Sequence, residues 1–332
     1  VPSPDPRRFN EIVVGILGRA LQVSPLELCS TVWTSNHVHS LVVVHDQKQL
    51  SRFMHHLGCN ISKEVGGRLR GWRGAFWERR YDGIVVSNEP EAQWRRLKYQ
   101  LSHGVKEGLV ESPLQWPGVH AARALVHGEP LEGYWFNRSK EWSANNRGLA
   151  VGRYDFATRY RVDFAQLPAF RHLTPEEYRG KVAELIREIE EGEARRDGNP
   201  VAGVDKILSQ SPYRPPTRQA QRSPKPRFHA ASKPARLDFE AELAAFLAEY
   251  WGASEVLRSG NLEAAGWFPE GCFPPALAFT GAAPPRRPPL PPTRRLEVLD
   301  TGEIERGAIP IVEIVPAVRN TEILPRARGQ PP

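Results

Sequence analysis

Two histidines separated by one residue lie in an apolar run that has the character of a β-strand. The run, residues 36–44, reads NHVHSLVVV and contains His37 and His39. Because side chains alternate along a strand, both imidazoles are expected on the same face of a sheet. Each neutral imidazole offers one lone pair, so the two together suit a divalent metal ion. Taken alone, the pattern is more typical of two polar side chains on a solvated sheet face.

A tyrosine and a third histidine follow in the segment WRRLKYQLSH, residues 94–103. Tyr99 and His103 are four positions apart, so they share a face of a predicted helix. A tyrosine hydroxyl, with a pKa of about 10, is a poor nucleophile unless a cation favours the phenolate. A nearby metal ion would do this and would also withdraw charge from a phosphate under attack. The alternative is a tyrosine packed inward and a histidine that complements the dipole at a helix end.

Hydrophobic periodicity predicts the elements that must position these side chains. They are a helix at 5–24, strands at 26–33 and 37–44, a helix at 46–65 ended by Gly66-Gly67, a strand at 81–87, and a helix capped by Asn88 that runs to about 103. One strand before residue 5 would complete a split β-α-β arrangement, and we expect it upstream of Val1. The predicted fold class is α+β, a ferredoxin-like or RRM-like antiparallel sheet with helices on one face.

The character of the chain changes after the region that carries these motifs. We expect a motif-bearing domain at 1–126 and an accessory region at 127–210, with a strand at 158–165 and a capped helix at about 174–195. A basic, proline-rich linker is predicted at 211–236, a short helical segment at 237–280, and a proline-rich, largely disordered tail at 281–332 with one strand near 309–315. The second half is thus predicted to be a mostly helical, partly disordered extension.

The net charge of +7 predicts a polyanionic partner, of which nucleic acid is the commonest. Arginines and aromatic side chains alternate in the loop at 66–80, and cations with aromatic faces suit single strands and hairpins. The candidate DNA contacts are Arg68, Arg70, Trp72, Arg73, Arg79, Arg80, Arg95, Arg96 and Lys98. Three scattered cysteines argue against a disulfide framework, and no apolar run approaches a membrane span. We therefore expect a cytoplasmic protein with no membrane partner.

Three segments in this order and spacing resemble the HUH-type single-tyrosine transposases, most of all the REP-associated tyrosine transposases. They are NHVHSLVVV at 36–44, FWERRY at 76–81 and YQLSHGVKEGLV at 99–110, and the resemblance covers about residues 5–125. The sequence departs from the family pattern where TSN replaces Met-Pro-Asn before the first histidine, at Ser40, and where His103-Gly104 replaces the common Asn-Pro.

The resemblance implies an HUH catalytic domain at 1–126 and a function. Tyr99 would be the nucleophile, and His37, His39 and His103 would hold Mg²⁺ or Mn²⁺, with the softer His103 favouring Mn²⁺. The activity would be metal-dependent cleavage of single-stranded DNA near palindromic hairpins through a 5′-phosphotyrosine, followed by rejoining. The protein would act as a monomer or a homodimer.

Other classes share parts of this pattern. A His-triad hydrolase requires a third alternating histidine where this chain has Leu41, and no second histidine pair of the two-histidine phosphoesterases is evident. A rolling-circle replication initiator or relaxase would share the metal and tyrosine chemistry. A non-catalytic or host-adapted protein that binds palindromes would share the fold. The last two classes stay open as alternatives.

Overall fold

The computed structural model describes residues 6–68, 75–194, 201–211, 227–269, 272 and 311–316. The chain divides into two compact units, one of residues 1–229 with 309–332 and the other of residues 230–308. The boundary expected near residue 126 falls inside helix α4 (Ala122–His127), within the first unit. Among the described residues, no helix combines the length and apolar character needed to cross a membrane.

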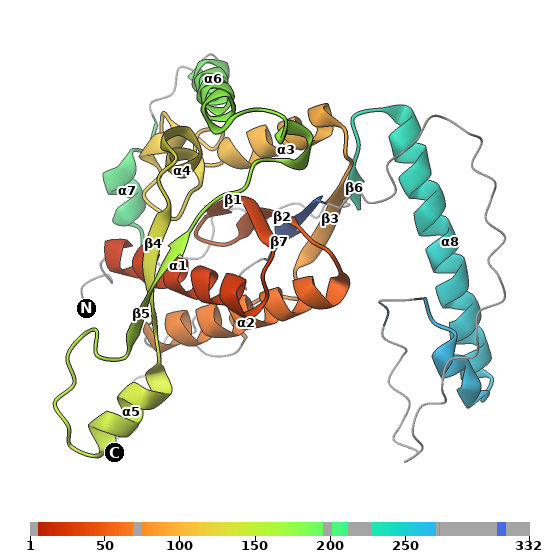
Figure 1. Cartoon of the computed structure of the whole chain (residues 1–332), viewed down its shortest axis with the longest axis horizontal. Helices are drawn as coiled ribbons and strands as arrows, with labels where there is room; N and C mark the ends of the chain where they lie inside the picture. Colours follow the sequence, from red (N-terminus) through yellow and green to blue (C-terminus); the bar gives the residue numbers. More distant parts are fainter. Residues whose placement is uncertain are drawn as a thin grey trace, which may run out of the picture. The chain divides into compact units, whose positions relative to one another are not determined.

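The first unit is built around a mixed five-stranded sheet, which confirms the α+β class (Figure 1). Its strands, in spatial order, are β1 (Glu27–Trp33), β2 (Val38–Val43), β7 (Ile311–Val315), β3 (Asp82–Val86) and β6 (Phe228–His229). All neighbours are antiparallel except β3 and β6, which pair in parallel. The sheet is therefore mixed at the β6 edge, where we expected a purely antiparallel one.

Strand β7 holds the central position between β2 and β3, although it comes from the far end of the sequence. It pairs antiparallel with both neighbours, and its sequence IVEIV is rich in the β-branched residues that favour strands. The strand predicted near 309–315 is thus confirmed at Ile311–Val315. The tail at 281–310 and 317–332, and the strand expected upstream of Val1, lie outside the described residues.

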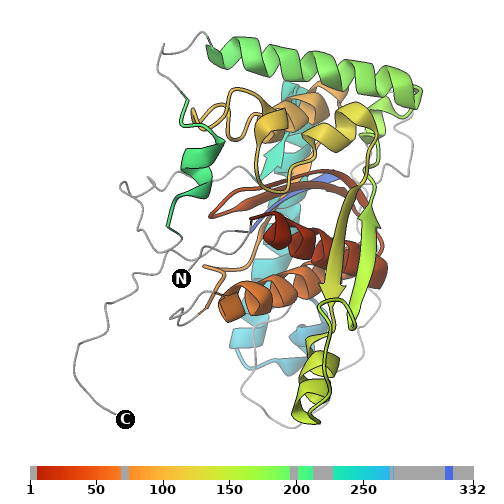
Figure 2. The ribbon, with the colours of Figure 1, turned by 90° about the vertical axis from the view of Figure 1, so that its left-hand side faces the viewer.

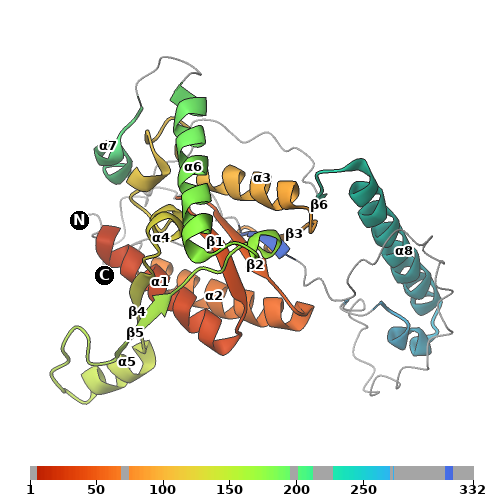
Figure 3. The same ribbon diagram turned by 45° about the horizontal axis from the view of Figure 1, so that its top comes forward.

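Helices α1 (Pro6–Val23) and α2 (Gln47–Arg68) cover one face of the sheet (Figures 1 and 3). Their apolar stripes pack on Val42 of β2 and on Val312 and Ile314 of β7 in one core. Helix α2 continues to Arg68 through Gly66-Gly67, where we expected it to end. A glycine within a helix costs roughly 1 kcal/mol. The burial of apolar side chains in the last turns, such as Val65, offsets this cost and lets the helix continue.

Helix α3 (Pro90–Leu101) lies on the opposite face, so helices cover both faces of the sheet and the one-face expectation is wrong (Figure 1). Because side chains alternate along β7, Glu313 points away from the α1–α2 core and toward α3, where Arg96 and Gln100 contact it. The helix begins at Pro90 with Glu89 at the capping position, rather than at Asn88. A proline at the first helical position has no amide hydrogen to leave unpaired, which explains the start.

A hairpin that the sequence only half predicted runs beside α1 (Figure 2). Its strands are β4 (Leu131–Phe136) and β5 (Ala157–Val162), with α5 (Arg138–Asn146) between them. A Cβ added to Gly15 would lie 2.0 Å from the Tyr134 carbonyl carbon, and one added to Gly133 would lie 2.1 Å from the Glu11 carbonyl oxygen. The two glycines therefore permit a backbone contact that no other residue type allows.

The first unit is completed by α4, α6 (Pro175–Ala194) and α7 (Val204–Leu208). The predicted capping box of α6 is confirmed, since Thr174 and Glu177 exchange hydrogen bonds. The second unit contains α8 (Lys233–Arg258) and a short 3₁₀ helix, η3 (Leu262–Gly266). Of the predicted linker at 211–236, residues 212–226 lie outside the described residues. Strand β6 and the start of α8 occupy its end, and the boundary between the two compact units, after residue 229, falls within it.

Candidate functional site

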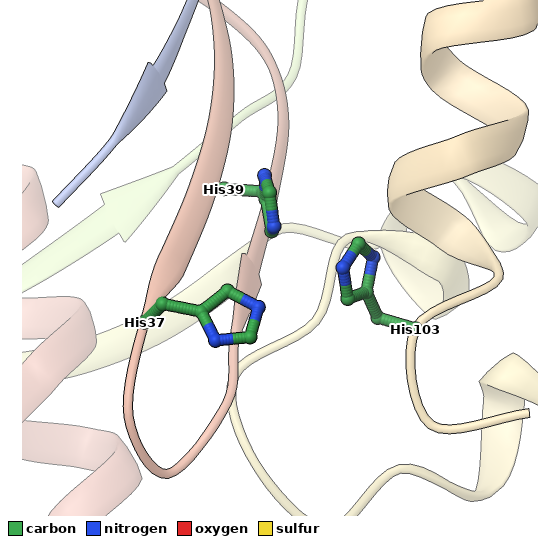
Figure 4. A group of neighbouring side chains, drawn as sticks. All are labelled: His37, His39 and His103. Carbon is green, nitrogen blue, oxygen red and sulfur yellow. The ribbon is translucent and has the colours of Figure 1, made fainter. Parts of the chain in front are cut away.

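The three predicted histidines converge on the α3 side of the sheet. One ring nitrogen of each of His37, His39 and His103 lies within 4.8 Å of the other two. The ring centroids are 4.9 Å apart for His37 and His39, and 4.3 Å apart for His39 and His103. Figure 4 shows the first two rings coming from the β1–β2 hairpin and the third from the turn after α3. The sequence interpretation of a three-histidine cluster is therefore confirmed in geometry.

Local structure explains why the rings meet. His37 precedes β2 and His39 lies within it, so both side chains leave the strand on the face opposite Val42. Helix α3 ends at Leu101, and Gly104 then adopts a φ of +91°, which lets the chain turn sharply. A Cβ at Gly104 would also lie 2.7 Å from the Trp116 ring. Glycine at this position thus both turns the backbone and admits the tryptophan that closes the turn.

The Nδ1 atom of each imidazole faces an oxygen acceptor. His39 Nδ1 lies 2.9 Å from Glu313 Oε1, His103 Nδ1 lies 3.0 Å from the Tyr99 carbonyl oxygen, and His37 Nδ1 lies 2.7 Å from Asn36 Oδ1. A proton held on Nδ1 by these acceptors leaves the lone pair on Nε2. Metal-ligating histidines are oriented by the same kind of partner on their second nitrogen. The local hydrogen bonds therefore favour the tautomer that a metal ion needs at all three rings.

His103 is buried and meets a cation on its other nitrogen. Burial, with smaller contributions from His39, Lys106 and His37, lowers the pKa of His103 to about 2, so the ring is neutral at neutral pH. Lys106 Nζ lies 3.1 Å from His103 Nε2. An ammonium group donates, so Nε2 accepts, which agrees with the Nδ1–H tautomer. In this arrangement the lysine takes the lone pair that a metal ion would use.

Tyr99 lies next to this cluster and is partly accessible. The residue is 39% exposed, and its ring centroid is 4.9 Å from that of His103 and 5.7 Å from that of His39. The Arg96 guanidinium carbon lies 4.0 Å from the ring centroid, and Lys106 Nζ lies 3.8 Å from it. Two cations therefore lie against the ring of a partly exposed tyrosine.

Glu313 of β7 is fully buried among the groups that hold the site. Its Oε1 accepts from His39 Nδ1 and from Gln100 Nε2 at 3.1 Å, and its Oε2 accepts from Arg96 Nε at 2.6 Å. Burial alone would raise the pKa of this carboxyl, but the neighbouring His229, His39 and Arg96 outweigh it and hold the pKa well below its usual range. The carboxylate is therefore ionised, and it links His39, a candidate metal ligand, to Arg96, whose guanidinium group contacts the Tyr99 ring.

The predicted DNA contacts are distributed unevenly. Arg70, Trp72 and Arg73 lie outside the described residues. Arg96 is mostly buried and forms an ion pair with Glu313, and the Arg80 guanidinium group lies over the Tyr81 ring. The remaining four contact acidic side chains of the same chain, in the pairs Arg68–Glu64, Arg79–Asp82, Arg95–Glu91 and Lys98–Glu188. The structure thus brings Arg96 to the tyrosine, and DNA binding by all nine residues stays a prediction.

Sequence reasoning missed Glu313, Lys106 and Gln100. One signal could have indicated Glu313, because it is a single acidic residue in the apolar run PIVEIVP, where burial of a charge needs partners. Lys106 lies three residues after His103, the spacing of one helical turn, and could have been singled out on that ground. Nothing in the sequence places residue 313 beside residue 39, since strand order is a tertiary property.

The cluster could bind a metal ion. Three nitrogens that bind one ion at about 2.1 Å lie roughly 3.4 Å from one another. Because the ligand nitrogens lie within 4.8 Å of one another here, the three rings need to move only slightly closer together to bind an ion. Imidazole nitrogen suits Zn²⁺, Fe²⁺ and related ions better than Mg²⁺, which prefers oxygen. No protein-family model, curated protein or solved structure matches this chain.

Proposed function

We propose that the protein is a metal-dependent tyrosine transposase of the HUH type that cleaves and rejoins single-stranded DNA. The observation that carries the proposal is the position of the partly exposed Tyr99 ring, beside His39 and His103 of the three-histidine cluster. A nucleophile next to a potential Lewis acid is what phosphoryl transfer to a tyrosine requires. The resemblance of three ordered sequence segments to the REP-associated tyrosine transposases points to the same chemistry.

The chemistry at Tyr99 follows from the groups around it. The tyrosine oxygen forms a bond to the scissile phosphorus, its proton leaves to solvent, and the bond from phosphorus to the 3′-oxygen breaks. The 3′-oxygen takes up a proton, which leaves a 3′-hydroxyl on one DNA end and a 5′-phosphotyrosine on the other. Arg96 and Lys106, both close to the ring, stabilise the negative charge that gathers on the phosphate.

His37, His39 and His103 would hold the metal ion, which supplies polarisation of a phosphate oxygen. The all-nitrogen donor set supports Mn²⁺ over Mg²⁺ as the preferred ion, because Mg²⁺ favours carboxylate, carbonyl and water oxygens. We expect cleavage to be faster with Mn²⁺ than with Mg²⁺ at equal concentration. Equal or higher rates with Mg²⁺ would contradict this assignment of the donor set.

Single-stranded DNA with hairpins is the substrate class that the residues support. The partly exposed Tyr99 is reachable by an extended strand, and the net charge of +7 favours a polyanion. The two cations beside the ring provide phosphate contacts at the point of attack. Contact of Arg79, Arg80 and the other surface arginines with the DNA stays a prediction.

The proposal is tested with hairpin-containing single-stranded oligonucleotides and Mn²⁺. A DNA–protein adduct that resists boiling in detergent is expected with the wild-type chain and not with Tyr99→Phe. Tyr154→Phe is the matched control, because Tyr154 has similar exposure (43%) and also lies beside an arginine, Arg153. Cleavage by Tyr99→Phe at the wild-type rate would refute the role of Tyr99. Hairpin binding without cleavage by the wild type would favour the non-catalytic alternative.

A further inference from the structure

We propose that Glu313 is a positioning residue of this site, and that strand β7 is therefore a functional part of it. The inference rests on the proposed metal site and extends it to the far end of the chain. The three histidines and Tyr99 all lie before residue 104, whereas Glu313 follows His39 by 274 positions. Our claim is that the histidine cluster reaches full metal affinity only when β7 is docked.

The first step of the argument is the hydrogen bond to His39. The other oxygen of Glu313 accepts from Arg96, and Oε1 lies 2.9 Å from His39 Nδ1 as an acceptor, so the contact requires a proton on Nδ1. In a neutral ring, the lone pair is then on Nε2. Both side chains are buried, at 7% and 0% exposure, so water does not readily replace either partner. The carboxylate thus fixes both the tautomer and the orientation of the ring, as such partners do in known metal sites.

The second step is that the same carboxylate also positions Arg96. Its Oε2 accepts from Arg96 Nε at 2.6 Å, and the guanidinium carbon of that arginine lies 4.0 Å from the Tyr99 ring centroid. Gln100, one turn further along α3, donates to Oε1. One carboxylate therefore ties strand β2, where the metal-ligand candidate lies, to helix α3, where the tyrosine lies.

The third step concerns the register of β7. Glu313 pairs with Leu41 on β2 and with Ile84 on β3, which places it on the same face as His39. A slip of one residue would turn Glu313 into the core formed by Val312, Ile314 and helices α1 and α2. The apolar neighbours thus enforce the register that delivers the carboxylate to the histidine.

The fourth step is the chemical cost of the residue. A strand at the centre of a sheet between two layers of helices is most simply filled by apolar side chains, as its four other residues are. Burying a carboxylate there is unfavourable unless it is paired and hydrogen-bonded. An apolar residue would serve packing alone, so the acid at this position indicates a role toward His39 and Arg96.

The affinity test uses the full chain and Mn²⁺ alone as the probe. We expect Glu313→Gln to bind Mn²⁺ about 10- to 100-fold more weakly than the wild type in calorimetric titrations. Glu188→Gln is the matched control, because it also removes one carboxylate that pairs with a cation of α3, Lys98, but contacts no histidine of the cluster. It should bind Mn²⁺ as the wild type does. Equal affinity of Glu313→Gln and wild type would overturn the inference.

A second measurement needs no variant and remains decisive if Glu313→Gln fails to fold. In the metal-free wild-type protein, ¹⁵N shifts of the imidazoles should report the Nδ1–H tautomer at His39, and the amides of Ile311–Val315 should exchange as slowly as those of β2. Fast exchange at 311–315, or the opposite tautomer at His39, would overturn the inference. A wild type that binds Mn²⁺ more tightly than Glu313→Gln yet forms no DNA adduct would uphold it and refute the proposed function.

Discussion

Replacing Lys106 by methionine should increase the affinity of the site for a divalent metal ion. The ammonium group lies 3.1 Å from His103 Nε2, the atom that would bind the ion. An ion about 2.1 Å from Nε2 along the same lone pair leaves no room for Nζ. Metal binding therefore first requires the lysine to release His103 and move away. Methionine keeps much of the length of the side chain and lacks both the charge and the donor.

The structure sets the size of the effect. Release of a hydrogen bond between a charged donor and a buried acceptor costs about 1.5 kcal/mol, at the low end of the usual range because the lysine side chain is 22% exposed. Once displaced to about 5 Å, the ammonium still repels a divalent ion by about 1.7 kcal/mol at the dielectric constant of water. Either the lost hydrogen bond or the repulsion alone corresponds to a roughly tenfold change in metal affinity, and the two together correspond to a few hundredfold. We therefore expect Lys106→Met to bind Mn²⁺ at least about tenfold more tightly.

The assay is calorimetric titration of metal-free protein with Mn²⁺ at low ionic strength. Lys98→Met is the matched control, because Lys98 is a lysine of α3 that pairs with Glu188 and not with a histidine. Its affinity should equal that of the wild type. Adduct formation by Lys106→Met should nevertheless be slower, since the cation over the Tyr99 ring is lost. Unchanged or weaker Mn²⁺ binding by Lys106→Met would refute the competition between lysine and metal.

Three further predictions concern the fold. Gly15→Ala should lower the free energy of unfolding by about 3 kcal/mol or more in urea titrations, because the added Cβ would overlap the Tyr134 backbone. Gly180→Ala is the control, since α6 has open space at this position, and it should raise the free energy of unfolding by about 0.5–1 kcal/mol. Equal effects of the two substitutions would contradict the close packing of α1 on β4. Burial, with a smaller contribution from Glu27, raises the pKa of Cys29 to about 12. Iodoacetamide at pH 8 should therefore label Cys59 and should not label Cys29 until urea unfolds the chain. Equal labelling rates of the two cysteines in the native protein would contradict the burial of Cys29. Burial opposes ionisation of Glu64, but Arg138 and Arg68 outweigh burial and lower the pKa of Glu64. The ion pairs of Glu64 therefore stabilise the fold at pH values above the ordinary pKa of a glutamate, and this stabilisation is lost as the pH falls. Glu64→Gln should lower the free energy of unfolding by about 1 kcal/mol at pH 7 and by little at pH 3, and a loss independent of pH would contradict the ion pairing.

The sequence predicted the local elements and the site histidines well, because both depend on short-range patterns. Side-chain alternation placed His37 and His39 on one face, and helical spacing placed His103 one turn from Tyr99. The approach of these two pairs in space followed only from the family resemblance, and the structure confirms it in geometry.

The sequence could not predict the centre of the sheet. The strand at 311–315 was visible as an apolar run, but its partner strands are set by which sheet position remains open in the folded chain. The same holds for Glu313, whose partners His39 and Arg96 come from two distant segments. Helix coverage of both faces was likewise hidden, because the apolar stripe of α3 indicates burial and not which face of the sheet it covers.

The most direct test of the account is to identify the residue that becomes linked to DNA. Wild-type protein incubated with Mn²⁺ and a hairpin oligonucleotide would be digested with a protease and a nuclease, and the modified peptide sequenced by mass spectrometry. The account predicts a nucleotide attached through its 5′-phosphate to Tyr99, with a free 3′-hydroxyl on the released strand. A linkage at another residue, or cleavage that leaves a 5′-phosphate with no covalent intermediate, would contradict it.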